Sequence, residues 1–233
     1  MKKVIFFDLD DTLYPYNDSN ARIQSEYEAI NHFCKRYPHC NFLEAFALYN
    51  DAKRAIKKRL ACFPAQDNRE LWFIEFMQKE GILDRKLLQE MEEIYWQYVI
   101  KNVVPYYDAT LILPYLAKKY TMGIITNGFK SIQEKKLNAL GISSYFSVIA
   151  TSSEAGFNKP HSDVFRLALR RAGMRAMNAV MIGDNPYFDM FPANKLKITS
   201  IWLRRGQRYY YPAIGKMKPI HTITNFLELK KWL

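Results

Sequence analysis

The sequence predicts an α/β protein in which a parallel sheet forms the core and an α-helical domain is inserted after the first strand. Two observations lead to this fold class. Short apolar runs, rich in β-branched residues, recur along the chain, and each ends abruptly in polar residues. Segments with helical spacing separate most of these runs, which is the alternation expected when parallel strands are buried on both faces.

The apolar runs are the predicted strands. In chain order they are Val4–Phe7, Met122–Ile125, Ser147–Ala150, Ala179–Ile182 and Ser200–Leu203. Apolar residues at helical spacing predict helices over 130–140 and 162–172 between the strands. The last residues, Leu227–Leu233, are expected to form a short terminal helix that closes the fold.

A long interval from Tyr14 to about Val104 breaks the strand–helix alternation. Apolar residues recur there at helical spacing over 23–33, 42–60, 71–77 and 87–99, with breaks near Pro38, Pro64 and Gly81. We therefore expect a core made of residues 1–14 and 105–233, and a helical domain of residues 15–104 whose two ends return to the same edge of the sheet.

Composition bounds the class of protein. The chain has 233 residues, of which 49% are hydrophobic and 24% charged, which is typical of a packed globular protein and excludes disorder as its main state. Its three cysteines are an odd number in a chain that is long enough to fold without disulfides, so a reducing, cytoplasmic setting is expected. The first apolar run ends at Asp8, too early for a signal peptide, and no run is long enough to span a membrane.

The formal net charge is +11, from 34 Lys and Arg against 23 Asp and Glu. This excess attracts anionic partners as a class, which includes nucleic acids, acidic surfaces and phosphorylated metabolites. Charge alone therefore does not select the partner.

Polar residues follow the predicted strands. In an open parallel sheet, ligands bind beyond the carboxyl ends of the strands, so these residues should converge in space. They are Asp8, Asp10, Thr126, Asn127, Lys159, Asp184 and Asp189. Gathering so many carboxylates is costly unless a cation or an anionic ligand balances them.

Four ordered segments resemble the motifs of the haloacid dehalogenase-like hydrolases. They are Asp8–Leu13, Thr126–Gly128, Lys159–Pro160, and Gly183–Asn185 with Asp189. The resemblance covers the chain apart from the helical insert, which lies where that family carries a helical cap. It implies a Rossmann-like core and is strongest to members that act as nucleotide 5′-monophosphatases. One difference is Pro192, which lies within the helix expected after Asp189.

Asp8 is placed as a nucleophile for in-line attack on phosphorus, which gives an aspartyl-phosphate. If the strand geometry persists, Asp10 faces the same side, where it can protonate the leaving oxygen and later activate water. Neighbouring carboxylates drive their pKa values apart, so one can stay protonated. The resemblance adds that members which dehalogenate carbon lack this second aspartate, so Asp10 favours phosphate chemistry.

The remaining candidates hold the phosphate and the metal. Thr126 and the backbone N–H groups of Asn127 and Gly128 can bind phosphate oxygens, and Lys159 can neutralise the phosphoryl group and the nucleophile. Asp8, the backbone carbonyl of Asp10, and Asp184 form an oxygen-only set that suits Mg²⁺. Asp189 is expected to orient Lys159 or a metal-bound water, and Asn185 to hydrogen-bond within the same group.

The first hypothesis is therefore a magnesium-dependent phosphatase of small phosphorylated metabolites, with pyrimidine nucleoside 5′-monophosphates, other sugar phosphates and a phosphosugar mutase reaction left open. A different class is a non-catalytic protein that binds RNA or acidic partners through basic surfaces such as Arg204–Tyr211. Under the first hypothesis we expect neither nucleic acid nor a membrane as a partner. Both a monomer and a homodimer remain open.

Overall fold

The computed structural model describes residues 3–17, 20–205 and 214–233. The chain divides into two compact units, one made of Met1–Pro15 and Val104–Leu233 and the other of Tyr16–Val103. Within the described residues, no helix has the length and apolar character needed to cross a membrane.

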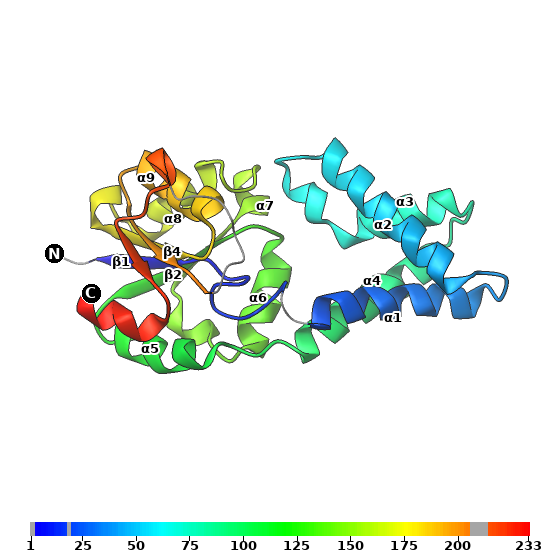
Figure 1. Cartoon of the computed structure of the whole chain (residues 1–233), viewed down its shortest axis with the longest axis horizontal. Helices are drawn as coiled ribbons and strands as arrows, with labels where there is room; N and C mark the ends of the chain where they lie inside the picture. The colour runs from blue at the N-terminus through cyan, green and yellow to red at the C-terminus, as the bar shows by residue number, and fades with distance from the viewer. Residues whose placement is uncertain (1–2, 18–19, 206–213) are drawn as a thin grey trace. The chain divides into compact units, whose positions relative to one another are not determined.

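The first unit is built on a six-stranded parallel sheet with the order β3-β2-β1-β4-β5-β6. Strands β1, β2 and β4 of this sheet are labelled in Figure 1. Its strands are β1 (Val4–Phe7), β2 (Thr121–Thr126), β3 (Val148–Thr151), β4 (Ala179–Gly183), β5 (Thr199–Leu203) and β6 (His221–Ile223). The five predicted strands are all present. The sixth, β6, was not predicted, and it pairs with β5 at the edge of the sheet.

Strand β1 lies between β2 and β4, and the register sets the level of the site. Phe7 is opposite Ile124 of β2 and Ile182 of β4. The next residue, Asp8, donates its backbone N–H to the carbonyl of Ile182 at 2.9 Å. Sequence order reverses at β1, so the carboxyl ends of β1, β2 and β4 surround a topological switch point, where ligands of open α/β sheets bind.

Helices cover both faces of this sheet. They are α5 (Tyr107–Ala117), α6 (Lys130–Ala139), α7 (Ser152–Ala155), α8 (Asp163–Ala172) and α9 (Phe191–Lys195). Helix α8 packs on β2 and β3, and its apolar residues Val164, Phe165 and Ala168 are fully buried there. Three short 3₁₀ turns, Ser143–Tyr145, Ala176–Asn178 and Gly215–Met217, connect the elements of this unit.

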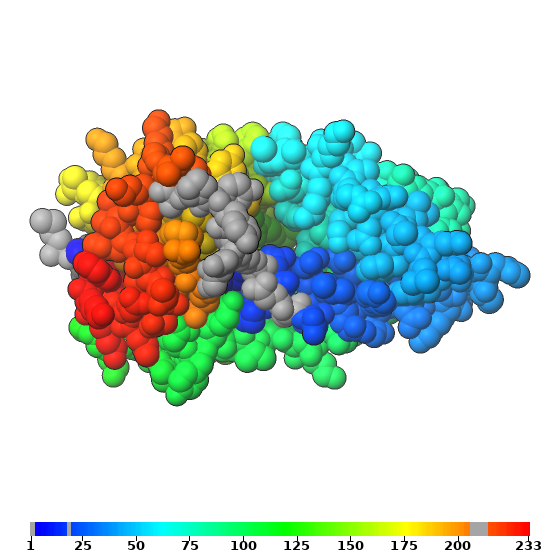
Figure 2. All heavy atoms as spheres, in the orientation of Figure 1, coloured from blue at the N-terminus to red at the C-terminus, as the bar shows by residue number. Residues whose placement is uncertain are grey.

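The C-terminal segment forms a 3₁₀ helix, η6 (Phe226–Lys231), where a terminal α-helix over Leu227–Leu233 was expected. Asn225 begins it with a capping box that includes Glu228. The segment packs beside α5 (Figure 2). There Asp108 accepts the backbone N–H of Phe226 at 2.7 Å and two hydrogen bonds from Arg205, each 2.7 Å, which explains why the turn is fixed at this position.

After Asp184 the chain forms a single π-helical turn, η4 (Pro186–Met190), before α9. Pro192 is therefore the second residue of α9, where its missing N–H and fixed φ are tolerated. The proline that interrupts the expected helix marks the place where a new helix begins.

The second unit consists of α1 (Asn20–Arg36), α2 (Phe42–Arg59), α3 (Arg69–Lys79) and α4 (Arg85–Lys101), with a 3₁₀ turn at Pro64–Asp67. Its core is aromatic, and the largest buried side chains are Phe33, Tyr49, Trp72, Phe73, Phe76 and Tyr95. Asn41, Asn68 and Asp84 cap the amino ends of α2, α3 and α4. The basic-aromatic run of the sequence, Arg204–Tyr211, falls largely outside the described residues.

Candidate functional site

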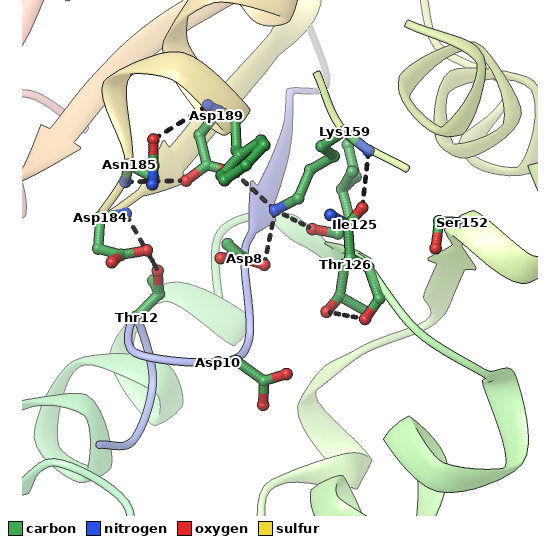
Figure 3. A network of polar contacts seen from close by, with 12 residues as sticks. Asp8, Asp10, Thr12, Ile125, Thr126, Ser152, Lys159, Asp184, Asn185 and Asp189 are labelled. Carbon is green, nitrogen blue, oxygen red and sulfur yellow. Dashed lines mark hydrogen bonds and ion pairs between the residues drawn. The ribbon is translucent and has the colours of Figure 1, made fainter. Parts of the chain in front are cut away.

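A buried lysine connects the carboxyl ends of three strands. Lys159 Nζ lies 2.7 Å from Asp8 Oδ1 and 2.7 Å from Asp189 Oδ1, and it donates to the carbonyl of Ile125 at 3.3 Å (Figure 3). Asp8 follows β1, Ile125 belongs to β2 and Asp189 follows β4. The ammonium group thus has acceptors from three parts of the sheet and is held in one position.

Burial governs the electrostatics of this cluster. It raises the pKa of Asp8 to about 7, against the lowering effect of Lys159. It also raises the pKa of Asp184, and the negative charges of Asp189 and Asp8 add to that effect. Although burial alone lowers the pKa of Lys159, Asp189 and Asp8 raise it above its ordinary value, so the lysine stays charged. Lys159 offsets only one of the three carboxylates, which leaves an excess of negative charge.

The excess charge and the donor atoms fit a hard divalent cation. One carboxylate oxygen from each of Asp8, Asp184 and Asp189 lies within 4.8 Å of the others. Asp184 Oδ2 is buried and accepts no hydrogen bond from the described residues. Both oxygens of Asp189 are engaged, one by Lys159 and the other by the backbone N–H of Asn185 at 3.1 Å. Asp8 and Asp184 are therefore the side chains best placed to bind a cation such as Mg²⁺.

Two neighbouring residues hold the loops that carry these carboxylates. Thr12 Oγ1 donates to Asp184 Oδ1 at 3.2 Å and accepts the backbone N–H of Asp184 at 3.1 Å. The Asn185 side chain accepts the N–H groups of Tyr187 and Phe188 at 3.0 and 3.1 Å. Asn185 therefore hydrogen-bonds within this cluster through its backbone N–H, to Asp189, while its side chain caps the π-helical turn.

Gly183→Ala should disrupt this site although it replaces none of its charged residues. A Cβ at Gly183 would lie 2.2 Å from Asp189 Oδ2, far inside van der Waals contact. The carboxylate would have to move, and Lys159 would lose one of its two ion pairs. We expect a loss of about 2 kcal/mol or more in unfolding free energy and at least a ten-fold drop in turnover. Urea unfolding and a phosphatase assay of Gly183→Ala beside the wild type check this. Wild-type stability and turnover in Gly183→Ala would contradict the role of Gly183.

The end of β2 provides the segment expected to bind phosphate. Thr126 Oγ1 donates to the carbonyl of Asn127 at 3.2 Å and accepts from Gln133 Nε2 at 2.8 Å. Asn127 Oδ1 accepts the backbone N–H of Lys159 at 2.7 Å, which ties this segment to the lysine. The N–H of Gly128, expected to face phosphate, donates to Ser152 Oγ at 2.9 Å.

Asp10 differs most from the sequence-based expectation. Strand β1 ends at Phe7 and Asp11 has a φ of 65°, so the strand geometry does not continue through Asp10. Its carboxylate points away from Asp8 (Figure 3). It lies 2.8 and 3.0 Å from Lys136 Nζ and 3.3 Å from Gln133 Nε2, and it also accepts from the hydroxyl of Tyr14.

The two aspartates consequently titrate differently. Burial alone raises the pKa of Asp10, but Lys136 and the hydrogen bonds from Tyr14 and Gln133 bring it below its ordinary value. In this state the raised pKa belongs to Asp8 and the lowered one to Asp10.

Comparison with known proteins agrees with this geometry. Residues 5–203 match the family model described as haloacid dehalogenase-like hydrolase, which is most of the chain. The chain belongs to this family. The matched residues include Asp8 and Asp184, which lie at the carboxyl ends of β1 and β4.

Relatives of this hydrolase cover nearly its whole length. It is 30% identical to ribulose-1,5-bisphosphate 5-phosphatase of Halopiger xanaduensis, over 86% of this chain and 84% of the other. It is 25% identical to pyrimidine 5′-nucleotidase YjjG of Escherichia coli, over 98% and 96%. The fold is similar to that of 2-haloacid dehalogenase from Pseudomonas syringae, with a TM-score of 0.76 at 24% identity over 99% and 97%. The family and the phosphatase relatives identify this hydrolase as a phosphatase.

Proposed function

We propose that the protein is a magnesium-dependent phosphatase that hydrolyses small phosphate monoesters through an aspartyl-phosphate on Asp8. The observation that carries the proposal is the position of Asp8, at the switch point of the sheet and 2.7 Å from a buried lysine. An ionised carboxylate held there by Lys159 is a fixed nucleophile, and the lysine also neutralises part of the charge that an incoming phosphate brings.

Two displacements at phosphorus follow from this arrangement. In the first, a carboxylate oxygen of Asp8 forms a bond to phosphorus and the bond to the leaving oxygen breaks. Asp10, which takes up a proton in the substrate complex, gives that proton to the leaving oxygen. In the second, Asp10 takes a proton from water as the water oxygen attacks phosphorus. The acyl-phosphate bond then breaks, which releases phosphate and restores the Asp8 carboxylate.

Asp8, the backbone carbonyl of Asp10, and Asp184 would hold the metal in this proposal. A bound Mg²⁺ supplies positive charge that offsets the oxygens of the phosphoryl group. Asp189 has a different part, since its contact with Lys159 keeps the ammonium group aimed at Asp8. Thr126 would exchange its contact with the Asn127 carbonyl for a phosphate oxygen.

Magnesium should stabilise the protein more at pH 8 than at pH 5. Because the pKa of Asp8 is raised to about 7, the folded protein without metal prefers the protonated acid, and its stability falls as pH rises from about 4 through about 7. At pH 5 the metal must displace that proton, whereas at pH 8 it relieves charge repulsion. We expect a rise in Tm of several degrees with excess Mg²⁺ at pH 8 and a much smaller one at pH 5.

Asp184→Asn is the matched variant for this measurement. It removes the charge of the carboxylate that has an unsatisfied oxygen, so the magnesium-dependent rise in Tm at pH 8 should largely disappear. A rise that is equal at both pH values, or one retained in Asp184→Asn, would contradict this metal site.

The substrate class rests on the relatives and on the helical unit. We propose pyrimidine nucleoside 5′-monophosphates as the first class to test, because a relative that matches 98% of this chain is a pyrimidine 5′-nucleotidase. Sugar phosphates are the second class. Residues 15–104 would act as the cap that selects the leaving group. Phosphate release from a panel of nucleotides, sugar phosphates and p-nitrophenyl phosphate, with and without Mg²⁺, tests this. Failure of every ester would overturn the proposal.

A further inference from the structure

Three side chains that the sequence analysis did not single out surround the Asp10 carboxylate. Lys136 Nζ contacts both of its oxygens, at 2.8 and 3.0 Å. Tyr14 donates its hydroxyl to Oδ1, and Gln133 donates to Oδ2 at 3.3 Å. Each oxygen of the carboxylate thus accepts hydrogen bonds from two donors.

Burial makes this arrangement unusual for a lysine. Lys136 is 2% exposed, although lysine is among the residues least often buried. Its neighbour Lys135 is on the exposed side of the same helix, as expected for a surface lysine. Removing an ammonium group from water is costly, and the close pair with Asp10 offsets that cost. Lys136 therefore cannot be explained as a solvated surface charge.

Helix α6 brings Gln133 and Lys136 to the same carboxylate, since residues three apart lie on one helix face. Gln133 also reaches the segment expected to bind phosphate. Its Nε2 has two hydrogens but three acceptors, namely Asp10 at 3.3 Å, Thr126 Oγ1 at 2.8 Å and the Asn127 carbonyl at 2.7 Å. A ligand that draws Thr126 away would change how firmly Gln133 holds Asp10.

We infer that Lys136 is a positioning residue, which with Tyr14 and Gln133 fixes the Asp10 carboxylate on the turn that follows β1 and sets the path by which it reaches the leaving oxygen. This rests on the proposed function, in which Asp10 carries the proton. Without Lys136, the carboxylate loses the contact that fixes the positions of both of its oxygens, and the Asp10 side chain samples several rotamers. Transfer to the leaving oxygen then becomes less frequent, because small losses of alignment reduce rates strongly.

The test compares two substrates whose leaving groups differ in their need for a proton. The p-nitrophenolate of p-nitrophenyl phosphate departs as a stable anion, whereas the 5′-alkoxide of a nucleotide must be protonated. The constant kcat/KM reports events up to leaving-group departure and excludes the later attack of water. Lys136→Met keeps the length and apolar character of the side chain, and Lys135→Met on the exposed face is the matched control.

For Lys136→Met we expect kcat/KM on uridine 5′-monophosphate to fall at least about ten-fold and that on p-nitrophenyl phosphate to change less than about three-fold. Asp10→Asn should show the same selectivity with a larger loss, and Lys135→Met should match wild type. Equal losses on both substrates would show a merely structural role and overturn the inference, as would no loss on either.

Two further measurements keep the outcome decisive. If Lys136→Met fails to fold, as judged by circular dichroism, Tyr14→Phe takes its place, because it removes only a hydroxyl. Its kcat/KM should also fall more on the nucleotide than on p-nitrophenyl phosphate, by a smaller factor than in Lys136→Met. Equal kcat/KM changes on the two substrates would overturn the inference. A wild-type enzyme that hydrolyses neither ester would instead refute the proposed function. Selective loss in Asp10→Asn with normal behaviour of the Lys136 and Tyr14 variants would overturn the inference alone.

Discussion

Asp8→Asn is expected to abolish phosphatase turnover, by about 10³-fold or more, without lowering stability at pH 8. The amide cannot form the bond to phosphorus, so the loss is chemical and not a loss of binding. Stability should be equal or higher without metal, because burial raises the pKa of Asp8 and the ionised acid is therefore disfavoured in the folded state. Lys159 keeps its second partner, Asp189.

Turnover measured together with thermal unfolding checks both halves of this prediction. Asp51→Asn is the control, because Asp51 is an exposed aspartate in the helical unit and its ion pair with Arg54 is solvent-accessible. Residual turnover near the wild-type level in folded Asp8→Asn would mean that another group attacks phosphorus.

Lys159→Met is expected to damage both activity and stability. It leaves Asp8 and Asp189 buried without the ammonium group that lies 2.7 Å from each. Removing one partner of a buried pair costs about 3–5 kcal/mol, because the remaining charge is uncompensated. The destabilisation should be greater at pH 8 than at pH 5, since burial raises the pKa of Asp8 and this carboxylate can accept a proton at low pH. Turnover should fall at least about 100-fold.

Urea unfolding at both pH values is the measurement, and Lys135→Met, which removes an exposed lysine, is the control. A loss of stability that does not depend on pH would indicate that packing of the lysine stem, and not its charge, holds the site together.

Strands could be predicted because buried parallel strands need continuous apolar runs, and Val4–Phe7 and Ala179–Gly183 are fully buried. The edge strand β6 escaped prediction because it has three residues, His221–Ile223, of which only Ile223 is buried. Helix α5 was also missed. It contains Pro114, and because proline is disfavoured inside a helix, the sequence of this segment does not indicate one.

The candidate site could be predicted as far as strand ends determine it. Asp8 and Asp184 each follow a central strand and Thr126 is the last residue of one, and parallel register brings these strand ends together. Thr12 appeared only as part of a motif, and its two hydrogen bonds to Asp184 depend on a turn that the strand pattern does not describe. Ser152, which accepts the N–H of Gly128, was not predicted. It directly follows β3, so the position of that strand's end could have indicated it.

Side-chain direction could not be predicted. The expectation for Asp10 assumed continued strand geometry, whereas the chain turns at Asp11 after β1 ends. Lys136 and Gln133 lie on a helix where lysine and glutamine ordinarily face water, so nothing local marks them as partners of a carboxylate far away in sequence. Only the packing of α6 against this turn brings them together.

The central claim is that phosphate is transferred to Asp8 before it reaches water, and trapping the intermediate tests it most directly. Asp10→Asn should release p-nitrophenolate in a burst equal to the enzyme concentration, because this leaving group needs no proton and the second step lacks its base. After acid quenching, mass spectrometry should find one phosphoryl group on the peptide that contains Asp8. An unmodified Asp8 peptide and no burst, while the wild-type enzyme turns over the same ester, would show direct attack by water and contradict the account.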